Sequence, residues 1–136
     1  MKISEEVRDS SILFTISINL GTMYERTLDH AKAMTCYNKA LYIAKKNPDK
    51  DEDDLAISYF KIGKLYQSLE KIDSAKYYLN ETLKIHLKRN DTAGLIFDYS
   101  NIASFEAKVG DYVNAEKNYN KALGFALANN DSLRLN

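Results

Sequence analysis

The sequence is poor in the residues that interrupt regular structure and in those that support covalent chemistry. Its 136 residues include one proline and five glycines, too few turn residues for a β fold of many strands. Cys36 is the only cysteine, so no internal disulfide forms. A single cysteine also does not indicate whether the protein works in an oxidising or a reducing compartment. The formal net charge is zero, which removes any general attraction to nucleic acid or to an anionic membrane. No apolar run reaches about 18 residues and no signal-peptide core begins the chain. We therefore expect no nucleic-acid and no membrane binding by this segment, while its cellular location is not indicated.

What the sequence does contain is an internal repeat with a period of 40–42 residues. An aspartate followed four residues later by a leucine occurs four times, at Asp9 and Leu13, Asp51 and Leu55, Asp91 and Leu95, and Asp131 and Leu135. Such a repeat decides the architecture before other signals are weighed. It divides the chain into three units, 9–50, 51–90 and 91–130. Residues 1–8 then form the end of a preceding helix or an N-terminal extension, and 131–136 start a truncated fourth unit, so the phase predicts a fragment of a longer array.

Each unit contains two stretches of helical periodicity joined by a short polar connection, which predicts an antiparallel helix pair. We expect Asp9, Asp51 and Asp91 to lie at helix N-termini, where a carboxylate accepts hydrogen bonds from unpaired N–H groups. The leucine that follows each aspartate should open the buried face. Small residues at matching positions should let the paired helices approach closely: Gly21, Gly63 and Ala103 in the first helices, and Ala33, Ala75 and Ala115 in the second.

These positions resemble the tetratricopeptide repeat, whose signature has an aliphatic-Gly pair, a Tyr three residues later and an Ala twelve after the Gly. Units one and two match with Gly21, Tyr24 and Ala33 and with Gly63, Tyr66 and Ala75, whereas unit three places Ala103 and Glu106 in the Gly and Tyr positions. The resemblance implies an all-α fold, an α-α superhelix formed as a right-handed solenoid of three antiparallel helix pairs. The long period is similar to that of kinesin light chains and of bacterial regulatory and sensor proteins. HEAT and armadillo repeats share the period but lack the Gly-to-Ala spacing.

The resemblance also implies a non-catalytic protein–protein interaction module, a fragment of a larger bacterial regulatory or sensor protein, which binds a peptide or partner helix in its concave groove. The groove positions carry four cations and one acid, Glu25, beside an apolar row, which favours an acidic-hydrophobic partner segment. The predicted partner-binding residues are Ile18, Asn19, Thr22, Arg26, Ile57, Phe60, Lys61, Lys64, Phe97, Asn101 and Lys108. A Lys/Asn clamp for a terminal carboxylate is expected to be absent, because only the two asparagines match it.

The alternative is a purely structural array that packs against other domains of its parent or forms a homodimer end to end, without a peptide ligand. A solenoid that lacks polar capping units exposes apolar ends, and Leu123 and Phe125 are the candidates for such an end.

No catalytic, cofactor or metal site is predicted. The acidic run at 49–54 lacks the Gly and Glu of an EF-hand at the required positions. His30 shares its repeat position with Ile72 and Tyr112 and is interpreted as a packing residue. His86 shares its position with Ala44 and Ala126, and the two histidines fall at different positions of different units, which does not indicate a metal site. Cys36 is interpreted as a buried or half-buried thiol and not as a nucleophile. Six of the ten tyrosines occupy repeat positions that a packed core explains: Tyr24, Tyr37, Tyr59, Tyr66, Tyr99 and Tyr119.

Overall fold

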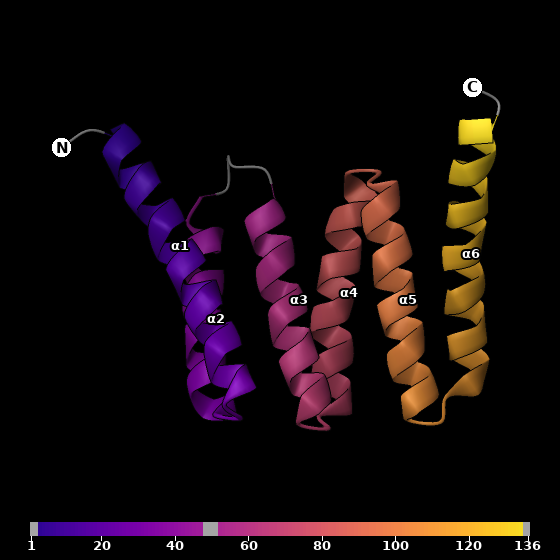
Figure 1. Ribbon diagram of the computed structural model, residues 1–136, viewed down its shortest axis with the longest axis horizontal. Coiled ribbons are helices and arrows are strands. Elements are labelled where there is room, and N and C mark those ends of the chain that lie inside the picture. Colours follow the sequence, from indigo (N-terminus) through magenta and orange to yellow (C-terminus); the bar gives the residue numbers. More distant parts are fainter. Residues whose placement is uncertain (1–2, 48–51, 135–136) are drawn as a thin grey trace. The chain divides into compact units, whose positions relative to one another are not determined.

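The computed structural model of the chain describes the backbone of residues 3–47 and 52–134, and the side chains of residues 8–47 and 52–130. Within these ranges it consists of helices without strands, so the predicted all-α class is confirmed (Figure 1). The chain divides into two compact units, Met1–Tyr78 and Leu79–Asn136, and the fourth helix contributes to both. The helices are α1 (Ile3–Arg26), α2 (His30–Lys45), α3 (Asp53–Ser68), α4 (Ile72–Lys88), α5 (Thr92–Lys108) and α6 (Tyr112–Arg134).

The aspartates of the repeat do not all begin a helix. Asp91 is the N-cap of α5, and its carboxylate accepts a hydrogen bond from the Gly94 N–H at 3.0 Å, as predicted. Asp9 instead lies inside α1, which begins at Ile3, so its prediction is wrong. The preceding segment contains no glycine or proline that would end a helix. Asp51 and Leu135 lie outside the described residues, and the α6 backbone runs through Asp131 without a break.

Turns of three residues join α1 to α2, α3 to α4 and α5 to α6, and they share one backbone geometry, which the turn between α4 and α5 repeats with a φ of 51° at Asn90. The middle residue of each has a left-handed φ: 63° at Leu28, 59° at Glu70 and 91° at Gly110. In each turn this residue and the next one donate to carbonyls of the last helical turn, which is the Schellman arrangement. In each turn the residue after the middle one donates a hydrogen bond to the carbonyl five residues before it. These hydrogen bonds run from Asp29 N to Tyr24 O at 2.8 Å, from Lys71 N to Tyr66 O at 3.0 Å, and from Asp111 N to Glu106 O at 2.8 Å.

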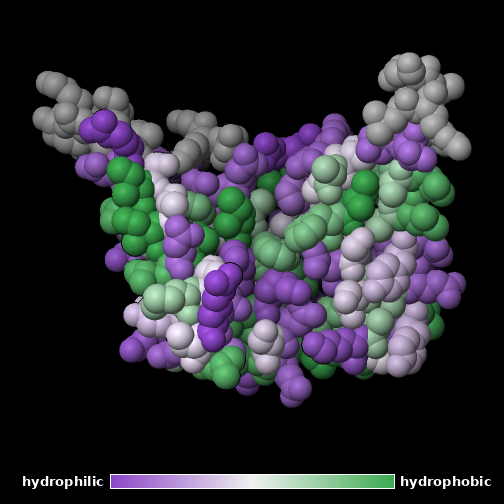
Figure 2. All heavy atoms as spheres, viewed as in Figure 1, coloured by the Kyte–Doolittle hydropathy of each residue, from purple (hydrophilic) through white to green (hydrophobic). Residues whose placement is uncertain are grey.

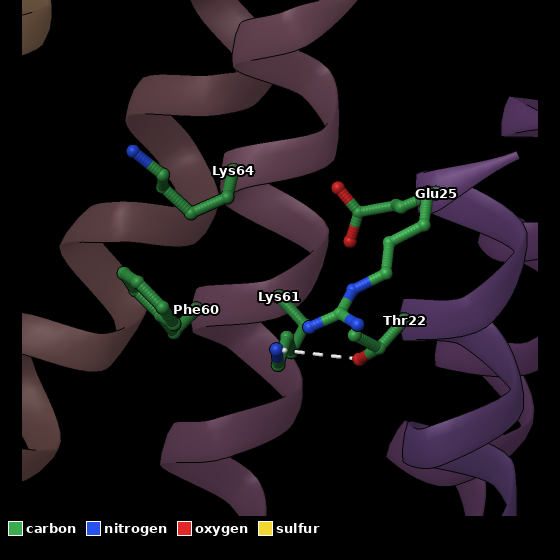
Figure 3. Close-up of a pocket in the computed structure, with 6 residues that line it drawn as sticks. Thr22, Glu25, Phe60, Lys61 and Lys64 are labelled. Atoms are coloured by element: carbon green, nitrogen blue, oxygen red, sulfur yellow. Dashed lines mark hydrogen bonds between the residues drawn. The ribbon is translucent and has the colours of Figure 1, made fainter. Parts of the chain in front are cut away.

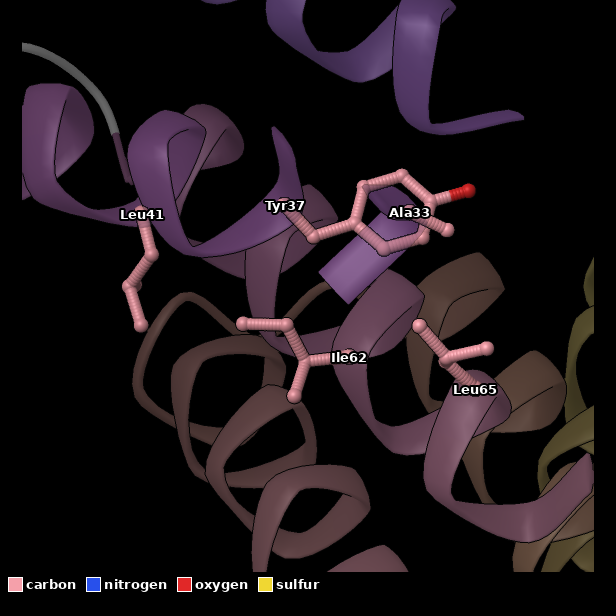
Figure 4. Close-up of a cluster of buried hydrophobic side chains, with 5 residues drawn as sticks. All are labelled: Ala33, Tyr37, Leu41, Ile62 and Leu65. Atoms are coloured by element: carbon pink, nitrogen blue, oxygen red, sulfur yellow. The ribbon is translucent and has the colours of Figure 1, made fainter. Parts of the chain in front are cut away.

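The core of the first unit forms where α2 packs against α1 and α3. Its central cluster consists of side chains that are at most 7% exposed, contributed by two helices: Ala33, Tyr37 and Leu41 from α2, and Ile62 and Leu65 from α3 (Figure 4). A Cβ atom on Gly21 would lie 2.4 Å from Cε1 of Tyr37, so the ring packs where only glycine leaves room. The predicted close approach at Gly21 is therefore confirmed.

The core of the second unit is formed by α5 against α6, with Leu95, Tyr99 and Ala122 buried. Phe125 was expected at an exposed end, but it is half-buried and stacks on Tyr99 with ring centroids 6.0 Å apart. Glu106 is buried and accepts a hydrogen bond from Asn118 Nδ2 at 2.7 Å.

The Glu106–Asn118 pair replaces an aromatic pair of the preceding repeat. The repeat spacing gives Glu106 and Asn118 the positions of Tyr66 and Tyr78, whose rings stack with centroids 5.6 Å apart. In the third unit, therefore, the buried glutamate that replaces the tyrosine is matched by an asparagine that hydrogen-bonds to it.

Some repeat positions predicted to be buried are exposed. Leu13 is 49% exposed because α1 buries another face, which carries Phe14, Ser17 and Gly21. Tyr119 on α6 is also exposed, while Leu123 is exposed as expected. Figure 2 shows hydrophobic side chains at the surface over α1 and again over α6. Among the described residues, no helix is both long enough and apolar enough to cross a membrane.

Candidate functional site

The first unit contains a pocket of about 410 Å³ between α1 and α3. In Figure 3, Thr22 and Glu25 extend from α1, and Phe60, Lys61 and Lys64 extend from α3. Arg26 is the sixth lining residue. Five of the eleven predicted partner-binding residues are therefore brought together here, namely all of the lining residues except Glu25.

The other predicted residues lie elsewhere. Ile18 is partly buried and packs against two core clusters of the first unit, which makes it a core residue. Asn19 on α1 and Ile57 on α3 are exposed but do not line the pocket. Phe97, Asn101 and Lys108 belong to α5 in the second unit, where Phe97 is 52% exposed and Asn101 donates to the Phe97 carbonyl at 2.9 Å.

A hydrogen-bonded network lies between the pocket and the core. Lys61 Nζ donates to Thr22 Oγ1 at 3.4 Å, which links α3 to α1 across the pocket (Figure 3). The Thr22 hydroxyl donates to the Ile18 carbonyl at 3.0 Å and lies 3.3 Å from the Tyr37 hydroxyl oxygen. The Tyr37 hydroxyl in turn donates to the Glu25 carboxylate. The buried Tyr37 hydroxyl thus contacts both Thr22, which accepts from Lys61, and Glu25, which lines the pocket.

Tyr37 is fixed as a hydrogen-bond donor by its surroundings. Its side chain is fully buried, and Gly21 on α1 leaves the space that its ring occupies. Burial raises the pKa of the phenol above its ordinary value, and the hydrogen bond to Glu25 raises this pKa further. The hydroxyl therefore stays protonated and remains directed at Glu25.

The pocket carries an excess of positive charge. Three cations and one carboxylate line it, and the pairing of charges is incomplete. Within the described ranges the side chains of Arg26 and Lys64 make no hydrogen bond or ion pair, and the Lys61 ammonium makes its hydrogen bond to the neutral Thr22 hydroxyl. A positively charged concavity with Phe60 in its wall can bind an acidic group that stands beside an apolar one.

A second polar cluster lies in the second unit, and the sequence did not reveal it. His86 Nδ1 hydrogen-bonds Asp98, which is 3% exposed, and His86 Nε2 lies 3.9 Å from Asp91 Oδ2. The sequence indicated only that His86 shares its repeat position with Ala44 and Ala126. Asp98 could have indicated the pair, because it is a charged residue on the same buried face of α5 as Leu95 and Ile102 and therefore needs a polar partner. Burial raises the pKa of Asp98, and the hydrogen bond and charge of His86 oppose that rise. Among the described side chains no group of three or more potential ligands is placed to hold a metal ion.

Comparison with known proteins identifies the fold and the family. A sequence model of the tetratricopeptide repeat matches residues 12–88. The crystal structure of BtubC (BKLC) from P. vanneervenii matches with a TM-score of 0.77 at 23% identity, over 85% of this chain and 46% of BtubC, so the chain spans about half of that protein. The crystal structure of the TPR domain of Arabidopsis FLU matches with a TM-score of 0.75 at 22% identity, over 88% of this chain and 98% of that domain.

These two structures show a shared fold, and the expected α-α superhelix class of helix-pair repeats is confirmed. A search of curated proteins gave no match. The family model covers more than half of the chain, and its description agrees with the repeat read from the sequence. The chain belongs to the tetratricopeptide repeat family.

Proposed function

We infer that this chain is a non-catalytic protein–protein interaction module that binds an acidic-hydrophobic segment of a partner protein in the pocket between α1 and α3. Tetratricopeptide repeats typically act as scaffolds that bind protein partners, which supports the first half of the proposal. The observation that carries the second half is the pocket itself, where Arg26, Lys61 and Lys64 converge without an ion-pair partner among the described residues.

The expected ligand follows from these groups. A carboxylate from the partner would pair with the cations, and a neighbouring apolar side chain would pack beside Phe60. Arg26 is exposed, whereas Lys61 and Lys64 are half-buried, so the lysines lose less binding energy to screening by solvent. An extended peptide or one turn of a partner helix can present an acid and an apolar residue at such close spacing.

The test uses a panel of short synthetic peptides in which acidic and aromatic residues alternate, together with versions in which lysine replaces each acid. Binding to the full chain is measured by isothermal titration calorimetry. We expect the acidic peptides to bind and the lysine versions not to bind. We also expect binding to weaken when salt rises from about 0.05 M to about 0.5 M, because the contacts are partly exposed.

The double variant Lys61→Glu/Lys64→Glu should abolish this binding while the helical content stays unchanged. Lys39→Glu/Lys45→Glu is a matched control, since it makes the same change of charge at exposed positions on α2 outside the pocket. Equal loss of binding in both variants would show that net charge rather than the pocket is responsible, and unchanged binding in the first variant would refute the proposal.

Self-association is the second candidate function, and the apolar face of α1 favours it. This face consists of four apolar side chains that are each at least 40% exposed, namely Leu13, Ile16, Leu20 and Met23. They recur at steps of three and four residues, a spacing that suits packing against a second helix. Sedimentation equilibrium of the chain and of an Ile16→Glu/Leu20→Glu variant tests this role. A dimer that the variant dissociates would support it, and a monomeric wild type at all concentrations would exclude it.

A further inference from the structure

We propose that the buried hydroxyl of Tyr37 keeps the pocket basic by holding Glu25 away from the three cations that share the pocket. Tyr37 is then a positioning residue, and Glu25 determines which ligands the pocket accepts. This inference rests on the proposed function, because it concerns the selectivity of the same pocket.

The first observation is an ion pair that does not form. Glu25 lines the pocket together with Arg26, Lys61 and Lys64. Within the described part of the chain it nevertheless makes no ion pair with any of them, and its carboxylate accepts its hydrogen bond from Tyr37. A carboxylate beside several cations normally pairs with one of them, so a competing interaction must hold it.

The second observation is that Tyr37 cannot follow Glu25 outward. Its ring is buried against Gly21, where Cε1, Cδ1 and Cζ would lie 2.4, 2.6 and 3.0 Å from an added Cβ. It also belongs to the core cluster with Ala33, Leu41 and Ile62. A hydrogen bond from a buried donor to a charged acceptor is stronger than one in water. The rigid phenol therefore determines where the flexible glutamate side chain rests.

The third observation is that the sequence combines these residues in one repeat only. The positions of Thr22, Glu25 and Tyr37 carry Lys64, Gln67 and Leu79 in the second repeat, and Ser104, Ala107 and Tyr119 in the third. Neither of these sets contains both an acid and a buried hydroxyl, since Tyr119 is 46% exposed. The arrangement is a specific feature of the first repeat and not a general property of the repeat pattern.

The consequence is that Glu25 does not neutralise the three cations of the pocket, which remain accessible to a ligand. Without the hydroxyl, Glu25 would turn toward Arg26, Lys61 or Lys64 and compete with an acidic ligand. With the hydroxyl in place, Glu25 still repels every anion, but the three cations outweigh it and leave a net positive charge, whose attraction grows with the negative charge of the ligand. The pocket therefore selects strongly anionic groups over weakly anionic ones.

The test uses inorganic phosphate as the probe, because it approaches two negative charges near neutral pH. Phosphate is titrated against chloride at constant ionic strength, and the backbone amides of Thr22 and Lys61 are followed by nuclear magnetic resonance in the full chain. The variants are Tyr37→Phe, Glu25→Gln and the double variant. Tyr42→Phe is the matched control, since it removes an exposed hydroxyl from the same helix.

We expect Tyr37→Phe to weaken phosphate binding and Glu25→Gln to strengthen it, each by about three- to tenfold. The double variant should bind as tightly as Glu25→Gln alone, because without the carboxylate the hydroxyl has nothing to restrain. A purely structural role of Tyr37 would not give this rescue. Tyr37→Leu, which places the residue of the second repeat in this position, provides a second variant if Tyr37→Phe folds poorly.

Wild-type binding that Tyr37→Phe leaves unchanged would overturn this inference and leave the proposed function standing. A loss that persists undiminished in the double variant would also overturn it. The absence of any saturable shift in the wild type and in Glu25→Gln would overturn both the inference and the proposed function.

Discussion

Replacing Gly21 with alanine tests the central packing contact of the first unit. In an exposed helix this change stabilises the protein by about 1 kcal/mol, because alanine has the higher helix propensity. Here the new methyl group would lie 2.4 Å from Cε1 of a fully buried ring, so either α1 or Tyr37 has to move. Overpacking of this kind costs about 1–3 kcal/mol, and displacement of the ring also weakens the hydrogen bond to Glu25, worth about 1 kcal/mol. The unfavourable contributions exceed the gain in helix propensity, and we expect a net loss of about 1–3 kcal/mol.

Chemical denaturation followed by far-ultraviolet circular dichroism measures this loss, and thermal unfolding should show a fall in Tm of roughly 5–20 °C for a unit of this size. Gly124→Ala on α6 is the matched control, since its added Cβ would meet no atom within 4 Å apart from the adjoining residues and backbone of its own helix, and it should stabilise the second unit slightly. The penalty of Gly21→Ala should also shrink in a Tyr37→Leu background. A Gly21→Ala protein as stable as the wild type, or a penalty that does not depend on residue 37, would refute the packing argument.

Two further predictions concern the turns and the buried acid. Leu28 has a φ of 63° and is 75% exposed, so Leu28→Gly should raise the free energy of unfolding by about 0.5–1 kcal/mol, whereas Gly110→Ala at the matching position should lower it by about 1 kcal/mol. Urea denaturation of both variants checks the signs, and a loss in Leu28→Gly would contradict the argument. The pKa of Asp98 is raised, chiefly by burial, so its contribution to stability is present below the ordinary carboxyl pKa of about 4 and is lost as the pH rises through the raised value. The Asp98→Asn variant, measured by denaturation as a function of pH, should show a flatter profile above about pH 4, and a slope equal to that of the wild type would count against this role.

The helix-pair architecture could be predicted from the sequence because its signals are local and repeated. Gly21 and Ala33 recur with fixed spacing, and each pair of helical stretches encloses a connection too short for any but an antiparallel arrangement. The helix ends were less predictable. Asp9 and Asp91 occupy the same repeat position, yet only Asp91 caps a helix, because helix-forming residues before Asp9 extend α1 beyond it.

The candidate site was predictable in position but not in detail. Repeat positions identified Thr22, Lys61 and Lys64 as neighbours on facing helices, and the structure places them around one pocket. The same positional reasoning put Ile18 in the groove, although its side chain packs into the core. The Tyr37–Glu25 and His86–Asp98 contacts join residues 12 positions apart on different helices. Such pairs depend on how two particular side chains meet, which a repeat pattern averaged over units does not describe.

The pair formed by Glu106 and Asn118 has a consequence for how such a chain can change by mutation. Its two positions are occupied by stacked tyrosines in the preceding repeat. In each repeat the two side chains satisfy one another, by a hydrogen bond in one case and by ring stacking in the other. Exchanging one member alone would leave a buried carboxylate facing a phenol ring, or an amide facing an aromatic face, so each single step passes through a poorly matched intermediate. We therefore expect the two positions to change together. We expect recombination between repeats to preserve stability when it carries both positions together, whereas a design based on the most common residue at each position separately would break the pair.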